Sequence, residues 1–292
     1  MEVNLKAGKA KAKIISQGAE LKSLVLGGRE LMWEADPKYW GKTSPVLFPM
    51  IGNLRNNRTV IDGKEYSISK HGFARDNDFE VSRMTDSTVS FTFKSNEQTR
   101  ISFPFDFEFT LHYTLTEDKL EILYEVTNKS RIPMPFCIGA HPAFACPAEG
   151  KSFSDYRLVF EEKETVSSPV LNTKIRMFEN ERRIWRLKNS NEYALNYSLF
   201  DNDCVYFPNL TSRNVSLLDN DDNGVKVSWE GFNSLGVWTP AGMEAPFVCL
   251  EPWCGADDFD TDNGVFREKQ GIQTGLPSAP MYYVMTIEAV NS

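Results

Sequence analysis

Two neighbouring stretches of the chain alternate between apolar and polar side chains, and this pattern constrains the fold most strongly. The first has apolar residues at Phe107, Phe109, Leu111, Tyr113 and Leu115, with polar residues between them. The second repeats the alternation over residues 120–127, after the turn-forming residues 117–119. A period of two residues places the apolar side chains on one face of an extended strand. The pair therefore predicts an antiparallel β-hairpin.

Short runs with strand-like composition occur along most of the chain, at residues 13–16, 88–93, 157–160, 214–218, 225–229, 247–250 and 282–290. Clusters of Gly, Pro, Asn and Asp separate them and have the chemistry of tight turns. No 12-residue window shows a period of 3.6, so helices are expected to be short, for example at residues 37–40. Neither a repeat nor a low-complexity linker is present. We therefore predict an all-β chain, with residues 1–292 in a single domain of mostly antiparallel sheets.

The charge balance bears on the possible partners. The chain of 292 residues has 40 acidic and 32 basic side chains, for a formal net charge of −8. Nucleic acid and anionic membranes are both bound through positive surfaces, so neither partner is expected. No stretch approaches the roughly 18 apolar residues of a membrane helix, and the N-terminal residues 1–13 lack the apolar segment of a signal peptide. These features predict a cytoplasmic protein.

The five cysteines carry little evidence of a disulfide framework or a zinc ribbon. They are odd in number, lie far apart and include no CxxC pair. We expect most of them to be small buried apolar residues in a reducing compartment.

The three histidines differ in their surroundings. His112 occupies a polar position of a regular strand, which is typical of a solvated sheet residue without a chemical role. His71 lies in Lys70-His71-Gly72 and His141 in Gly139-Ala140-His141-Pro142. Glycine permits positive φ or a close approach, and proline restricts φ, so each imidazole is predicted to sit on a shaped turn. Each could instead be a buried histidine bonded to a backbone carbonyl.

A second candidate site stretch is the Leu250-Glu251-Pro252-Trp253 segment. Glu251 follows an apolar run and would be costly to bury unless it is paired or functional. We expect Pro252 to end that strand. Trp253 offers an apolar plane that could stack on a sugar ring, although Glu251 could also be a solvated residue at the end of the strand.

Two further polar groups are candidates for ligand binding. Arg55 follows the run Phe48-Pro49-Met50-Ile51-Gly52 and could direct its guanidinium at hydroxyls, a carboxylate or a phosphate, or form a salt bridge in a turn. In the run from Leu199 to Phe207 we expect only one of Asp201 and Asp203 to face a site, and the sequence alone leaves both open.

Four segments together, FPMIGNLR, HGFAR, GAHPAF and LEPW, occur in this order in the chain. In them the sequence resembles the aldose 1-epimerase (galactose mutarotase-like) family, in its shorter branch with the LacX-type proteins, from Asn4 to Val290. The resemblance implies a galactose mutarotase-like β-supersandwich, with two large, mostly antiparallel sheets packed face to face, few short helices and a sugar site in a cleft.

The resemblance also implies a reaction, the interconversion of the α and β anomers of a free aldose without a metal or an organic cofactor. Carried onto this chain, Glu251 is expected to be the base for the C1 hydroxyl and His141 the acid for the ring oxygen. His71 would orient the sugar, Arg55 would bind its oxygens, and Asp203 would hold hydroxyls, with Asp201 as an alternative match two residues away. A histidine can donate a proton near neutral pH, and a glutamate is ionised there and can accept one, so the two residue types suit these roles.

Several other interpretations remain open at this point. A hexose 6-phosphate could be the substrate, with Arg55, Lys70 and Arg75 as cationic partners. The chain could bind a sugar without turnover, using Trp253 and Phe73, or two histidines and two carboxylates could hold a metal. A glycosidase would require two carboxylates about the bond to be cleaved, which fits less well. Beyond its sugar substrate, the protein is expected to act as a monomer or a homodimer.

Overall fold

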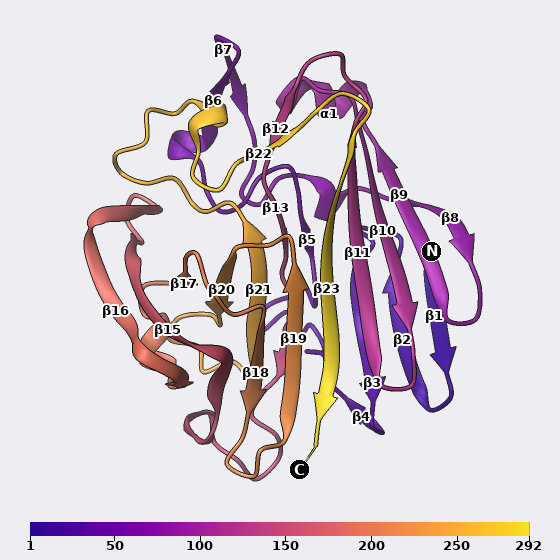
Figure 1. Cartoon of the computed structure of the whole chain (residues 1–292), viewed down its shortest axis with the longest axis vertical. Coiled ribbons are helices and arrows are strands. Elements are labelled where there is room, and N and C mark those ends of the chain that lie inside the picture. Colours follow the sequence, from indigo (N-terminus) through magenta and orange to yellow (C-terminus); the bar gives the residue numbers. More distant parts are fainter. Residues whose placement is uncertain (292) are drawn as a thin grey trace.

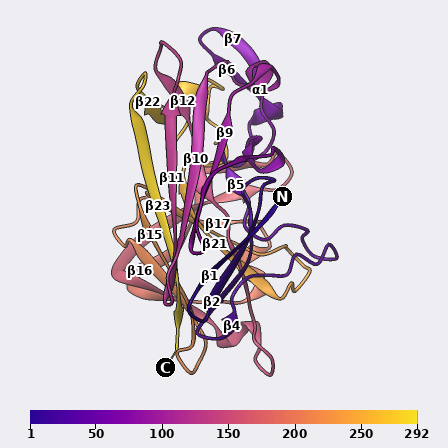
Figure 2. The same cartoon turned by 90° about the vertical axis from the view of Figure 1, so that its right-hand side faces the viewer.

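The computed structural model describes residues 1–291, which form two layers of β-sheet packed face to face (Figures 1 and 2). Within these residues the first layer is a nine-stranded antiparallel sheet. In spatial order it contains β16 (Met177–Ala194), β15 (Arg157–Asn172), β18 (Asn214–Leu218), β19 (Gly224–Glu230), β23 (Pro280–Val290), β11 (Lys119–Asn128), β10 (Phe107–Leu115), β9 (Thr88–Lys94) and β8 (Glu80–Met84).

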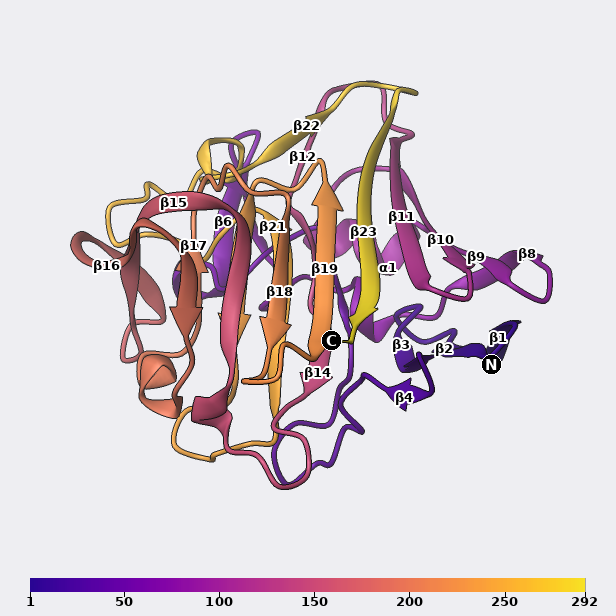
Figure 3. The same ribbon diagram turned by 60° about the horizontal axis from the view of Figure 1, so that its bottom comes forward.

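The second layer combines two sheets. The described residues place β17 (Val205–Phe207), β20 (Ser234–Trp238), β21 (Phe247–Cys254), β13 (Ile138–Ala140) and β5 (Val46–Leu47) in a six-stranded sheet, which β14 (Ala143–Ala145) completes by pairing with β21. The neighbouring sheet contains β1 (Glu2–Ala7), β2 (Ala10–Ile15), β3 (Leu21–Leu26) and β4 (Arg29–Glu30). A bridge between Met32 and Phe144 links the two sheets. Strands β18, β19 and β23 run side by side in front of β21 when the molecule is seen from below (Figure 3).

The remaining elements are short. Two-stranded ribbons are formed by β6 (Arg58–Ile61) with β7 (Lys64–Ser67) and by β12 (Met134–Phe136) with β22 (Gln273–Gly275). Helix in residues 1–291 is limited to α1 (Glu97–Ser102) and the 3₁₀ turns η1 (Arg55–Asn57), η2 (Ala74–Asp76), η3 (Phe153–Asp155), η4 (Tyr197–Phe200) and η5 (Phe266–Glu268). None of the helices in this part of the chain has the length and apolar character needed to cross a membrane.

The hairpin predicted from the alternating residues is confirmed. Strands β10 and β11 pair antiparallel, with Phe109 opposite Val126 and Leu111 opposite Tyr124. These apolar side chains are buried against the second layer, where Phe48 packs on Phe109 at 4.9 Å between ring centroids. The alternation therefore places one face of this hairpin in the core between the layers.

The short helix expected at residues 37–40 is wrong. This segment is a turn in which Tyr39 and Trp40 both donate their backbone N–H to the carbonyl of Asp36. The carboxylate of Asp36 accepts from the backbone N–H of Lys38 at 2.9 Å. A side chain that bonds the backbone two residues ahead stabilises a turn in place of a longer helix. A helix instead begins after Asn96, whose side chain accepts from the backbone N–H of Thr99.

Candidate active site

Seven side chains singled out in the sequence line one cavity of about 240 Å³: Lys70, His71, Arg75, His141, Asp203, Glu251 and Trp253. They come from segments that are far apart in the chain, and the sheet of the second layer brings them together. The cavity is smaller than the roughly 300–1,000 Å³ typical of sites for drug-sized ligands. Its size therefore suits a single small molecule.

Glu251 lies in the middle of β21 and is 1% exposed. The expectation that Pro252 ends this strand is wrong, because β21 continues to Cys254. Leu250 donates its backbone N–H to Pro142, and backbone nitrogens two residues apart point to the same side of a strand. The nitrogen of Pro252 therefore faces a place where no N–H donor is required, because the neighbouring strand is interrupted there.

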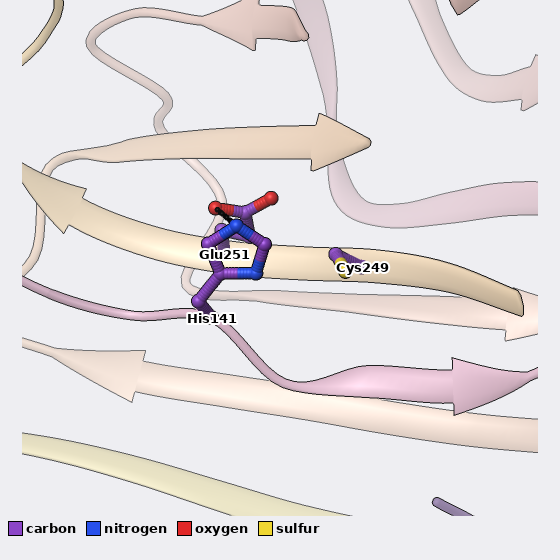
Figure 4. A group of neighbouring side chains, drawn as sticks. All are labelled: His141, Cys249 and Glu251. Carbon is purple, nitrogen blue, oxygen red and sulfur yellow. Dashed lines mark ion pairs between the residues drawn. The ribbon is translucent and has the colours of Figure 1, made fainter. Parts of the chain in front are cut away.

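That interruption carries His141. Strand β13 pairs with β21 up to Trp253, and β14 resumes the pairing opposite Cys249, so His141 and Pro142 form the break between them. The break directs the imidazole at Glu251, with 3.2 Å between Nε2 of His141 and Oε2 of Glu251 (Figure 4). Neither carboxylate oxygen accepts a well-aligned hydrogen bond from residues 1–291. This buried pair is thus free to interact with a ligand.

His71 is held by a reciprocal contact with Gly52. Its backbone N–H donates to the carbonyl of Gly52 at 3.0 Å, and the N–H of Gly52 donates to Nδ1 of His71 at 3.1 Å. Because Nδ1 is the acceptor, a neutral His71 has its proton on Nε2, which can donate to a ligand. His71 itself has φ +64°, which is uncommon for a residue with a side chain. The shaped turn predicted from the HGFAR segment is therefore present.

Burial shifts the pKa values of Glu251 and His141 in opposite directions. Loss of solvation holds the pKa of Glu251 well above its ordinary value of 4.5, against the opposing effect of Lys70. Loss of solvation, followed by the positive charges of Arg75 and Lys70, holds the pKa of His141 well below 6.5. A raised pKa makes a carboxylate a better proton acceptor and a lowered pKa makes an imidazolium a better donor.

The aromatic side chains that line the cavity differ from the expectation that Trp253 offers its plane to a sugar ring. Trp253 lines the cavity but is only 2% exposed, because Gly139 and Gly236 pack closely against its indole. Trp40 stacks on His141 at 4.9 Å between ring centroids, and Trp238 meets the same imidazole edge-on at 5.7 Å. Both of these tryptophans are half-buried and offer more apolar surface than Trp253.

Phe73 lies elsewhere. It packs among the core aromatics, stacked on Phe107 with 6.1 Å between ring centroids. His112 also lies away from the cavity, between Ser90 and Glu125 on the nine-stranded sheet.

The structure places Asp203 in the cavity and leaves Asp201 exposed after the 3₁₀ turn η4. Lys70 approaches Asp203 across the cavity mouth, with 3.8 Å from Nζ to Oδ2. Beyond these two residues the mouth continues into a second space of about 320 Å³, which Arg176 also lines. Asp203 and Lys70 therefore line both spaces, and Arg176 lines only the second.

Arg55 does not line this cavity. Its guanidinium donates to the backbone carbonyl of Asp260 at 2.7 Å, and it borders a separate, open depression of about 570 Å³. The segment that contains Arg55 supports the site in another way. The backbone N–H and the side-chain amide of Asn53 both donate to one oxygen of Asp257, at 2.6 and 2.7 Å.

Several cavity residues were not identified as site residues from the sequence. Asp257 is buried and lines the cavity, and burial raises its pKa. The available signal in the sequence was an acidic residue three positions after the buried strand β21. Trp40 and Trp238 gave no such signal, because their neighbours in sequence do not contribute to the cavity.

Three buried side chains could hold a metal ion. Ligand atoms of His141, Cys249 and Glu251 all lie within 4.8 Å of one another (Figure 4). Cys249 and Glu251 are two residues apart on β21, so both project from the same face of the strand.

The fold and the cavity define a β-sandwich protein in which a buried histidine and a buried glutamate meet in a cavity of the size of a small molecule. Comparison with known proteins shows the family, since the family model for aldose 1-epimerase matches residues 1–269. The chain belongs to the aldose 1-epimerase family. It is 32% identical over 286 residues to the plasmid-encoded protein LacX of Lactococcus lactis subsp. lactis, covering 95% of each chain.

Two crystal structures show the same fold. One is a galactose mutarotase related enzyme from Lactobacillus acidophilus, with a TM-score of 0.92, 32% identity and coverage of 100% of this chain and 98% of that one. The other is a galactose mutarotase-like protein from Lactobacillus casei ATCC 334, with a TM-score of 0.89, 31% identity and coverage of 99% and 100%. The galactose mutarotase-like all-β fold expected from the sequence is therefore confirmed.

The burial of Glu251 predicts a stability that depends on pH. Since its folded-state pKa lies above the unfolded value, its contribution to stability is full below about pH 4.5 and is lost as pH rises through the folded pKa. Glu251→Gln removes this loss. We therefore expect the melting temperature of the variant minus that of the natural protein to increase as pH rises from 5 to 9. The increase should be about 2–4 °C for each kcal/mol of unfolding free energy that the natural protein loses.

Thermal melts at several pH values measure this difference. Glu149→Gln, at an exposed position, is the control and should show a difference that stays flat with pH. A flat difference for Glu251→Gln as well would contradict the assigned burial of a carboxylate charge.

Proposed function

We propose that this chain is a mutarotase that interconverts the α and β anomers of a free aldose by general acid–base catalysis. The observation that supports this most directly is the buried His141–Glu251 pair, 3.2 Å apart in a cavity for a small molecule. Their pKa shifts run in the directions that favour proton donation by the histidine and proton acceptance by the glutamate.

The proposed reaction moves one proton between the two residues by way of the sugar. Glu251 takes the proton of the C1 hydroxyl while protonated His141 gives one to the ring oxygen, and the bond from C1 to the ring oxygen breaks. An open-chain aldehyde, a neutral carboxyl and a neutral imidazole result. Rotation about the C1–C2 bond and closure from the other face return both protons. Because burial disfavours charge, it favours the uncharged pair that ring opening produces.

The spacing of the pair also separates this reaction from glycosidic cleavage. The C1 hydroxyl and the ring oxygen are bonded to the same carbon, so their acid and base must lie close together. Retaining glycosidases instead use two carboxyl groups about 5–5.5 Å apart, and inverting ones about 6.5–9.5 Å. The short distance between a histidine and a carboxylate therefore supports chemistry at a hemiacetal.

Other cavity residues would bind the sugar. We assign His71 Nε2 as a donor near the ring oxygen, Asp203 as an acceptor for hydroxyls, and Trp238 as an apolar wall. Lys70 and Arg75 both line the cavity, whereas Arg55 does not. These two cations make a hexose 6-phosphate the second candidate substrate, because they could pair with its phosphate.

We also propose a cytoplasmic location and a monomeric or homodimeric state. The location is supported by the cysteines, all five of which are free thiols. Such thiols are typical of proteins in a reducing compartment.

The test of the proposed function is the rate of anomer exchange. Freshly dissolved α-galactose, α-glucose and α-glucose 6-phosphate are followed by optical rotation or by their anomeric proton signals, with and without the protein. We expect acceleration of at least one sugar, unchanged by EDTA. Binding of these sugars without acceleration would favour a sugar-binding protein, and loss with EDTA would contradict a metal-free mechanism.

Substitution of Asp203 should separate binding from catalysis. Asp203→Asn removes a charged acceptor for sugar hydroxyls, and such hydrogen bonds are worth about 1.5–3 kcal/mol. We expect KM to rise by about tenfold or more, with a smaller change in kcat. Asp201→Asn is the matched control and should leave both constants unchanged, because Asp201 lies outside the cavity. An effect at Asp201 that exceeds the effect at Asp203 would reverse the assignment.

A further inference from the structure

We infer that His141, Cys249 and Glu251 form a binding site for Zn²⁺, and that a bound Zn²⁺ ion blocks the sugar site. The inference begins from the geometry of the three side chains, whose ligand atoms lie within 4.8 Å of one another. At zinc–ligand distances of about 2.0–2.3 Å, a tetrahedral ion would separate its ligand atoms by roughly 3.3–3.6 Å. The 3.2 Å between His141 and Glu251 already matches one edge of that tetrahedron.

The burial of the three residues gives a second, independent observation. Glu251 is 1% exposed, and neither of its oxygens has a well-aligned hydrogen-bond partner within residues 1–291. Buried carboxylate oxygens without a hydrogen-bond donor are costly, and an ion bound to Glu251 would offset that cost.

The donor set selects the kind of ion. A thiolate, an imidazole and a single carboxylate suit Zn²⁺, whereas Ca²⁺ and Mg²⁺ require several oxygen ligands. Cys249 and Glu251 project from the same face of β21, and Figure 4 shows the imidazole of His141 lying against Glu251. Binding releases the thiol proton of Cys249 as the bond from zinc to sulfur forms, with no oxidation.

The three ligands leave one zinc position open. Glu251 and His141 line the cavity, so the fourth position faces the space where the sugar would lie. A metal in this position holds the acid and the base away from the sugar. This part of the inference rests on the proposed function, whereas Zn²⁺ binding itself does not.

The binding test uses the full-length protein in metal-free form and without sugar. Zn²⁺ is titrated in competition with a chromophoric chelator, and Co²⁺ is added separately to detect the absorption of a thiolate bound to cobalt. We expect one tight site and a thiolate band. Cys249→Ser should remove the band and weaken Zn²⁺ binding by more than the roughly 10–100-fold that loss of an outer partner costs.

Cys204→Ser is the matched control, because Cys204 lines the cavity together with His141 and Glu251 but is not one of the three clustered ligands. It should bind Zn²⁺ as the natural protein does. Equal affinity in the natural protein and Cys249→Ser, or a loss in Cys204→Ser, would overturn the inference. If a thermal melt shows that Cys249→Ser does not fold, the natural protein decides the test by itself. Absence of its cobalt–thiolate band would then overturn the inference.

A separate measurement tests the block of the sugar site. Zn²⁺ should slow anomer exchange by the natural protein, EDTA should restore it, and Cys249→Ser should resist the same Zn²⁺ concentration. Full activity of the zinc-loaded natural protein would overturn the block. If the protein accelerates no anomer exchange, the proposed function fails while the binding test still decides whether Zn²⁺ is held.

Discussion

Replacing Glu251 with glutamine is expected to lower kcat for anomer exchange by about 10²–10⁴-fold, the usual contribution of a general base. Glutamine keeps the shape of the side chain but cannot take the proton of the C1 hydroxyl. The protein should remain folded, because the substitution removes a buried charge that has no aligned hydrogen bond. Progress curves from optical rotation measure the rate, and near-ultraviolet circular dichroism checks the fold. A rate equal to that of the natural protein would remove Glu251 from the mechanism.

His141→Asn is the companion variant and should also lose about 10²-fold or more, because the ring oxygen loses its proton donor. The two residues act on the same carbon, so we expect the double variant to be little worse than either single one. Losses that multiply would indicate that His141 and Glu251 act independently. That outcome would contradict the transfer of one proton between them by way of the sugar.

Gly72→Ala is expected to have the second large effect, on folding as well as on activity. Gly72 has φ +73°, and a Cβ atom there would lie 2.2 Å from the carbonyl oxygen of Phe48. The left-handed conformation costs a residue with a side chain about 1–2 kcal/mol, and overpacking costs about 1–3 kcal/mol more. We expect the free energy of unfolding in urea to fall by about 3 kcal/mol. Activity should fall too, because His71 precedes this glycine.

Gly63→Ala is the control for backbone conformation. Gly63 also has a left-handed φ of +81°, but nothing lies within 4 Å of the position that a Cβ atom would take. Its cost should therefore be about 1–2 kcal/mol without loss of activity. Equal losses at Gly63 and Gly72 would show that contact with Phe48 contributes nothing.

The fold was predictable where local pattern carries the information. The alternation around Phe109 and Tyr124 sets which side chains face the core, because the side-chain period of a strand is two. The irregular segments around His71 and His141 were also visible, since glycine and proline change the backbone wherever they occur. The turn at residues 37–40 was mistaken for a helix, because the side-chain hydrogen bond of Asp36 competes with helix formation at short range.

The candidate site was predictable only in part. His141 and Glu251 stood out as a polar residue beside proline and a carboxylate after an apolar run. The burial of Trp253 and the direction of the Arg55 side chain could not be predicted, because both depend on neighbours that are distant in sequence. Gly236 covers Trp253, and the carbonyl of Asp260 takes the guanidinium of Arg55.

The sequence by itself determined the all-β class, the central hairpin and the residue types available for acid–base chemistry, since each follows from composition or from neighbours along the chain. Only the tertiary structure decided that His141 meets Glu251, that Asp203 and not Asp201 enters the cavity, and that Asp257 and Trp40 line it. The break between β13 and β14 brings His141 to Glu251 only because both strands pair with β21. Distances and burial arise from contacts between distant segments, and these shift the pKa values on which the proposed chemistry depends.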